Sequence, residues 1–103
     1  MDGDLIDLPK LIDLCEKYDA YLYIDDAHGF GVLGKNGQGT LEYYYPKLDL
    51  SSNRKKRLIY MVTLGKSVGI SGAFVLASNQ TIKYLVQKAK TYIYTTALSP
   101  ALA

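Results

Sequence analysis

Cysteine and long apolar runs are scarce in this 103-residue chain, and each scarcity excludes a class of protein. The one cysteine, Cys15, rules out an internal disulfide framework and is compatible with a reducing cytosol. No apolar run approaches the length that crosses a bilayer, so we predict no membrane segment. The acidic residues 1–4 lack the basic and apolar regions of a signal peptide. We therefore expect a globular, cytoplasmic protein.

Positive charge is in only small excess, with a formal net charge of +2 at pH 7. Much of that excess lies in Arg54-Lys55-Lys56-Arg57, and such a run more often forms a solvated loop before a strand than a phosphate site. The chain has ten tyrosines, but those at 43–45 have no interleaved basic residues of the kind that accompany stacked bases. We predict no nucleic-acid binding.

Apolar periodicity predicts one small α/β domain or part of one. Apolar residues at helical spacing predict a helix over about 8–18, and a short connection leads to a strand over 21–25. Two more buried strands are predicted at 58–63 and 72–77, followed by a helix over 79–90 that Ser78 or Asn79 would start. The connection between the two later strands is too short for a parallel crossover, so we expect that pair to be antiparallel.

Glycine is concentrated between residues 29 and 40, which predicts an ordered loop and not a flexible linker. The pattern Gly29-x-Gly31-x-x-Gly34 has the letters of a dinucleotide fingerprint, but more loop follows it where a helix is needed. Gly65-Lys66-Ser67 does not complete a P-loop, because position 60 holds tyrosine where that motif requires glycine. Residues 40–57 are polar and poorly periodic, and most of them are predicted as turn and loop.

Charged side chains follow the first predicted strand at its carboxyl end. Residues 21–24 favour a strand that is covered on both faces, and Asp25, Asp26 and His28 come next. Ligands of open α/β sheets bind at this edge. A loop start or a helix cap is the alternative interpretation of the Asp-Asp pair. A metal site is disfavoured because no second histidine or cysteine cluster accompanies these residues.

The second predicted strand brings another set of polar groups, Thr63 and Lys66. A partly desolvated lysine can form a Schiff base, an aspartate can keep a pyridine nitrogen protonated, and hydroxyls can bind a phosphate. Together with Asp25 and His28, these groups predict a pocket for pyridoxal 5'-phosphate. The alternative is that Lys66 is an ordinary exposed lysine.

Five motifs then point to one enzyme family. They are residues 1–4 (Met-Asp-Gly-Asp), 25–34 (Asp-Asp-Ala-His-Gly-x-Gly-Val-Leu-Gly), 37–42 (Gly-x-Gly-Thr-Leu-Glu), 63–66 (Thr-Leu-Gly-Lys) and 96–101 (Thr-Ala-Leu-Ser-Pro-Ala). In this order they resemble the α-oxoamine synthases, fold-type-I pyridoxal phosphate enzymes that condense an amino acid with an acyl thioester. The resemblance covers the whole chain. It implies part of a large domain with a mostly parallel sheet, one antiparallel strand and flanking helices.

The resemblance also implies a role for five residues. Lys66 would be the Schiff-base lysine, Asp25 the partner of the pyridine nitrogen, and His28 the donor to the cofactor phenolic oxygen. Thr63 would bind the phosphate, and Thr96 would reach the phosphate of the neighbouring subunit. A homodimer with shared active sites is therefore expected.

Three positions depart from the family pattern. Val62 stands where the family usually has a small residue, Phe30 where it often has threonine, and Ser99 where it often has proline. These differences concern packing or substrate preference more than the cofactor chemistry.

Within the family, residues 25–29, 71–73 and 97–103 favour the branch that condenses L-alanine with a pimeloyl thioester, carried on CoA or on acyl-carrier protein. Branches that use glycine or serine are the alternative. Family subunits are several times longer than this chain. We therefore expect a central fragment of the large domain, with little or no condensing activity by itself. The non-enzymatic alternative is an inactive piece that only folds or associates.

Overall fold

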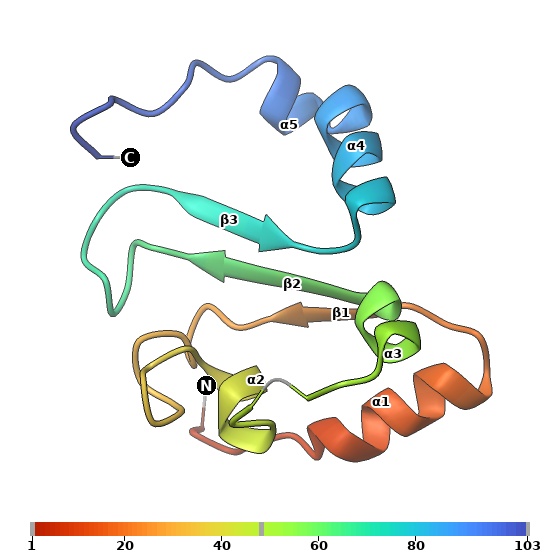
Figure 1. Ribbon diagram of the computed structural model, residues 1–103. Coiled ribbons are helices and arrows are strands. Elements are labelled where there is room, and N and C mark those ends of the chain that lie inside the picture. The colour runs from red at the N-terminus through yellow and green to blue at the C-terminus, as the bar shows by residue number, and fades with distance from the viewer. Residues whose placement is uncertain (1, 48, 103) are drawn as a thin grey trace.

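A computed structural model describes residues 2–47 and 49–102, and a three-stranded sheet with the order β1-β2-β3 lies at its centre. Strand β1 (Leu22–Asp25) runs parallel to β2 (Leu58–Thr63), and β3 (Ala73–Leu76) runs antiparallel to β2 (Figure 1). The predicted sheet, with one antiparallel strand, is confirmed.

Helices flank this sheet in two groups. The helices are α1 (Leu8–Lys17), α2 (Thr40–Tyr44), α3 (Ser52–Arg57), α4 (Asn79–Lys88) and α5 (Lys90–Ile93). Helix α1 contacts β1, α2 and α3, whereas α4 contacts α5, and Figure 1 shows the strands between these two groups. No helix among residues 2–47 and 49–102 has the length and apolar character needed to cross a membrane.

The core forms where the apolar stripe of α1 meets one face of β2. The α1 helix begins after Asp7, whose side chain accepts a hydrogen bond from the Lys10 N–H at 3.2 Å. Residues of β2 alternate between buried and half-buried, as the pleat of a strand requires. The buried apolar side chains are Leu8, Ile12, Ile24, Leu50, Leu58, Tyr60 and Val62. The apolar residues at helical spacing in α1 and at alternate positions in β2 therefore pack into one core.

The prediction of turn and loop for residues 40–57 is wrong, because α2 and α3 lie within this range. Both helices are too short to show an apolar period, so the sequence pattern does not reveal them. Helix α3 is nevertheless capped, since the Ser51 hydroxyl accepts a hydrogen bond from the Arg54 N–H at 3.3 Å.

The basic run 54–57 is likewise helical and not the solvated loop that we expected. Two of its side chains, three positions apart on α3, face acidic groups of α1 and of the turn after it. Arg54 contacts Asp13 at 2.8 Å and Glu16 at 2.9 Å, and Arg57 pairs with Asp19. The run therefore joins α3 to α1.

Strand β1 is covered on one face only by the described part of the chain, which corrects the prediction of a strand covered on both faces. Tyr21 and Tyr23 are 65% and 57% exposed, whereas Ile24 is buried. The side chains of a strand alternate between its two faces, and the packed helices of this chain cover the face that holds Ile24.

The later elements also differ at their ends from the prediction. Strand β3 begins only at Ala73, and the predicted helix 79–90 is divided, because Ala89 has extended backbone between α4 and α5. The Ser78 cap of α4 is confirmed by its hydrogen bond from the Thr81 N–H at 3.2 Å.

Candidate active site

The parallel pairing of β1 and β2 places their carboxyl ends at one edge of the sheet. Asp25 is in register with Met61, and the Asp26 N–H extends the ladder by donating to the Met61 carbonyl at 2.9 Å. Thr63 ends β2 two residues later. Polar residues from two distant parts of the sequence therefore come together, as predicted.

An open cavity of about 590 Å³ lies at this edge. Three of the predicted site residues, Asp25, His28 and Lys66, line it, and residues 3–6 and the glycine loop form much of the remaining wall. The volume is in the range of small-molecule sites, and an amine, a carboxylate and an imidazole border the same space.

Lys66 is exposed in this structure, which corrects the expectation of a partly desolvated side chain. The residue lies beyond the last paired residue of β2, in the connection to β3, where solvent reaches it. The connection is nonetheless ordered. The Leu64 N–H donates to the Gly72 carbonyl at 2.9 Å, and the Lys66 carbonyl accepts from the Gly69 N–H at 3.1 Å. Lys66 is therefore held by backbone hydrogen bonds and not by burial.

The two predicted phosphate ligands occupy different places. Thr63 is half-buried at the end of β2, and its hydroxyl accepts a hydrogen bond from the Gly65 N–H at 3.2 Å. Thr96 is exposed in the segment after α5. Neither threonine is among the described residues that line the cavity. The role of Thr96 across a subunit boundary stays a prediction.

Asp26 has a structural role that the sequence motifs do not indicate. Its side chain is 4% exposed, and Oδ2 accepts a hydrogen bond from the Thr40 N–H at 2.7 Å. The Thr40 hydroxyl donates to Oδ1, and the Tyr60 hydroxyl donates to Oδ2. The sequence signal was the alternation of the strand, since Ile24 and Asp26 are both buried while Asp25 between them is exposed.

The pKa of Tyr60 shows how closed this environment is. Burial raises the pKa of the phenol well above its ordinary value of 10.0, and the hydrogen bond to Asp26 and the charge of that carboxylate raise it further. Tyr60 therefore stays protonated, and it remains a donor to Asp26 over the physiological pH range.

A second buried carboxylate, Glu42, holds the far half of the glycine loop. Glu42 is 2% exposed, and its oxygens accept from the Asn36 N–H at 3.1 Å and from the Gln38 N–H at 3.0 Å. Burial acts to raise the pKa of Glu42, but the hydrogen bonds from Gln38 and Asn36 outweigh it and lower the pKa below its ordinary value. No periodic pattern in the sequence indicates this contact.

The glycine loop is also attached to the segment that carries Lys66. The Ser67 hydroxyl donates to the Phe30 carbonyl. The Phe30 ring packs edge-on against Phe74 of β3, with 5.5 Å between the ring centroids. Phe30, one of the departures from the family pattern, is therefore a packing residue in this chain.

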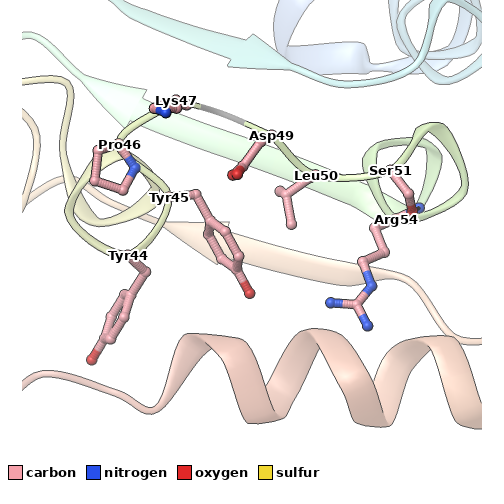
Figure 2. Close-up of a pocket in the computed structure, with 8 residues that line it drawn as sticks. All are labelled: Tyr44, Tyr45, Pro46, Lys47, Asp49, Leu50, Ser51 and Arg54. Carbon is pink, nitrogen blue, oxygen red and sulfur yellow. Dashed lines mark hydrogen bonds between the residues drawn. The ribbon is translucent and has the colours of Figure 1, made fainter.

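A second cavity, also of about 590 Å³, lies between α2 and α3. Figure 2 shows the rings of Tyr44 and Tyr45 and the side chain of Arg54 directed toward α1. Arg54 is already paired with Asp13 and Glu16, so its charge is neutralised by the protein. The first cavity combines a lysine, a carboxylate and an imidazole, and we take it as the candidate active site.

Within the described ranges 2–47 and 49–102, no group of three or more histidine, cysteine, aspartate or glutamate residues is placed to hold a metal ion. Lysine and histidine beside a carboxylate instead suit an organic cofactor with an electrophilic carbonyl.

Comparison with known proteins assigns this chain and its fold to a class. Residues 1–103 match the family model described as aminotransferase class I and II, and the chain belongs to that family. It is 52% identical over 103 residues to the 8-amino-7-oxononanoate synthase of Janthinobacterium sp. (strain Marseille), and it covers 24% of that protein.

Solved structures agree with this assignment. The 8-amino-7-oxononanoate synthase (bioF) from Francisella tularensis is 40% identical, with a TM-score of 0.74 over 95% of this chain and 27% of the other. A structure of SPT with PLP internal aldimine has a TM-score of 0.76 at 28% identity, over 97% of this chain and 23% of the other. The chain spans about a quarter of the length of these relatives. The resemblance found in the sequence is confirmed.

Proposed function

We propose that the full-length protein containing this chain condenses L-alanine with a pimeloyl thioester and releases carbon dioxide and the thiol carrier. The product is 8-amino-7-oxononanoate, an intermediate of biotin synthesis. The observation that carries the proposal is the 52% identity to 8-amino-7-oxononanoate synthase across all 103 aligned residues of the chain.

The cofactor is pyridoxal 5'-phosphate, as family membership and the structure of SPT with PLP both indicate. The residues present fit it, because one cavity offers an amine for the aldehyde, a carboxylate for the pyridine nitrogen and an imidazole for the phenolic oxygen. When bound, the cofactor supplies an electron-accepting ring that stabilises negative charge at the substrate α-carbon.

Four residues of the chain have a defined task in this proposal. Lys66 holds the cofactor through Nζ and later moves a proton at the substrate α-carbon. Asp25 keeps a proton on the ring nitrogen through its negative charge. His28 donates a hydrogen bond to the phenolic oxygen. Thr63 binds the phosphate of its own subunit.

The assembly and location belong to the same proposal. Thr96 would bind the phosphate of the partner subunit in a homodimer, so that each active site draws residues from two chains. An amino acid and an acyl-CoA or acyl-carrier protein are the expected substrates. A cytoplasmic location belongs to this proposal, and the single cysteine is compatible with such a reducing compartment.

Lys66 gives the direct test. Borohydride reduction of the full-length protein loaded with pyridoxal phosphate, followed by peptide mass mapping, should place the pyridoxyl label on Lys66. Lys66→Ala should remove the label and the visible absorption band, whereas Lys35→Ala, a change of another lysine in the glycine loop, should keep both. A label on a different lysine would refute the site assignment.

Substrate identity needs a separate measurement. Purified full-length protein should release carbon dioxide and free thiol when given L-alanine and pimeloyl-CoA, and should give much less product with glycine or serine. Preferred turnover of serine with a long-chain acyl-CoA would favour the serine-using branch of the family instead.

A further inference from the structure

We propose that Asp26 is a positioning residue for the candidate active site, and this inference rests on the proposed function. Its buried carboxylate clamps the glycine loop to β2 and thereby holds the turn that presents Asp25 and His28 to the cofactor. Asp26 itself does not need to contact the cofactor for this role.

The backbone of Asp26 is hydrogen-bonded both to β2 and to the turn that follows β1. Its N–H donates to the Met61 carbonyl at 2.9 Å, and its carbonyl accepts from the N–H groups of Gly29 at 3.2 Å and Phe30 at 3.0 Å. These bonds close the turn that contains His28. The orientation of that turn therefore depends on where Asp26 is held.

The side chain of Asp26 is hydrogen-bonded to two further elements. Three donors from two other elements converge on it: the N–H and hydroxyl of Thr40, which begins α2, and the hydroxyl of Tyr60 in β2. At 4% exposure, this carboxylate has little access to water that would replace these bonds. Adjacent residues at a strand end point to opposite sides, so fixing Asp26 also fixes the direction of Asp25.

Glycines next to the clamp show how tightly it is enclosed. A Cβ at Gly29 would overlap Asp26 Oδ1 and Thr40 Oγ1, and a Cβ at Gly39 would overlap Asp26 Oδ2 and the Tyr60 hydroxyl. The backbone of the loop thus approaches the carboxylate as closely as atoms allow on both sides. Small movements of Asp26 must be transmitted to residues 27–29.

The contrast between Asp26 and Glu42 makes the inference testable. Both carboxylates are buried and both hold the glycine loop, but the hydrogen bonds of Glu42 go to residues 36 and 38 and not to the turn at 26–29. A purely structural role would give the two the same consequences. A positioning role would affect the bound cofactor only when Asp26 is changed.

The experiment compares Asp26→Ala, Asp26→Asn and Glu42→Gln in the full-length protein loaded with pyridoxal phosphate. For each we would measure the melting temperature, the dissociation constant for pyridoxal phosphate, and the pH midpoint of its visible absorption band. That midpoint depends on how close the charge of Asp25 and the imidazole of His28 lie to the cofactor.

Asp26→Ala should weaken cofactor binding by about tenfold and shift the pH midpoint by about half a unit or more. Asp26→Asn, which keeps the shape and one acceptor oxygen, should recover part of both. Glu42→Gln should lower the melting temperature while the midpoint stays unchanged. If Asp26→Ala does not fold, Asp26→Asn and Tyr60→Phe carry the test, and both should shift the midpoint in the same direction.

An unchanged midpoint and affinity in the folded Asp26 variants would overturn the inference, as would an equal shift in Glu42→Gln. A wild-type protein that shows no visible band with pyridoxal phosphate would instead refute the proposed function. The two failures are therefore distinguishable.

Discussion

Tyr60 and Asp26 lie 34 positions apart in the sequence, and the phenol of the first donates a hydrogen bond to the buried carboxylate of the second. The bond joins β2 to the turn that follows β1. Asp26 also lines the cavity that Asp25, His28 and Lys66 border, so the core and the candidate site share one polar contact.

Removal of this hydroxyl should destabilise the protein in a pH-dependent way. Tyr60→Phe should cost about 2 kcal/mol near neutral pH, since a hydrogen bond to a charged acceptor is lost. The folded state raises the pKa of Tyr60, so its contribution is complete below the unfolded value of 10.0 and is lost as the pH rises above that value. Thermal melts from pH 7 to 11 should therefore show the variant and wild type converging at the alkaline end.

Tyr84→Phe is the matched control for that experiment, because Tyr84 is 65% exposed on α4. It should melt like the wild type at every pH. A gap between Tyr60→Phe and wild type that stays constant up to pH 11 would contradict the argument.

Glu42 predicts the opposite dependence on pH. Its folded pKa is lowered, so its contribution is present above the ordinary value of 4.5 and is lost as the pH falls through the folded value. Glu42→Gln should lower the melting temperature at pH 7 by on the order of 5 °C, and the difference should shrink below pH 4.5. Asp49→Asn, at an exposed carboxylate, should change little at either pH.

Two glycines with positive φ should respond very differently to the same substitution. Gly39 has φ +90°, and an added Cβ would overlap Asp26 and Tyr60, whereas Gly69 has φ +74° with no atom of the described chain within 4 Å. Gly69→Ala should cost about 1 kcal/mol from backbone strain alone. Gly39→Ala should cost several times more or prevent folding, as soluble yield and thermal melts would show. Equal effects of the two changes would argue against the packing around Asp26.

Subunit mixing tests the predicted role of Thr96. If Thr96 completes the partner's site, a dimer of one Lys66→Ala chain and one Thr96→Ala chain contains one intact site. A one-to-one mixture should then regain roughly a quarter of wild-type activity, because half of the random dimers are mixed and each has one working site of two. If Thr96 serves its own subunit, mixing should restore nothing beyond the two parent activities.

Local sequence patterns alone determined much of the fold and of the site. The spacing of Leu8 and Ile12 predicts α1, the alternation of Leu58, Tyr60 and Val62 agrees with a strand, and the short connection after β2 predicts the antiparallel partner. These features depend on neighbouring residues, and their periods are visible in any window of the chain. The positions of Asp25, His28 and Lys66 after predicted strands suggested one pocket, and the family resemblance supplied the mostly parallel sheet that brings them to one edge.

Only the tertiary structure decided which polar groups are buried and what holds them. Asp26 meets Thr40 from 14 positions away and Tyr60 from 34, and the arginines of α3 meet the acids of α1 across a similar distance in the sequence. Short helices such as α2 and α3 depend on these contacts more than on their own residues. Lys66, predicted to be partly desolvated, is exposed for the same reason. Strand alternation indicates that Asp26 shares a face with Ile24, but the groups that pack around a side chain come from distant residues, and local sequence does not reveal them.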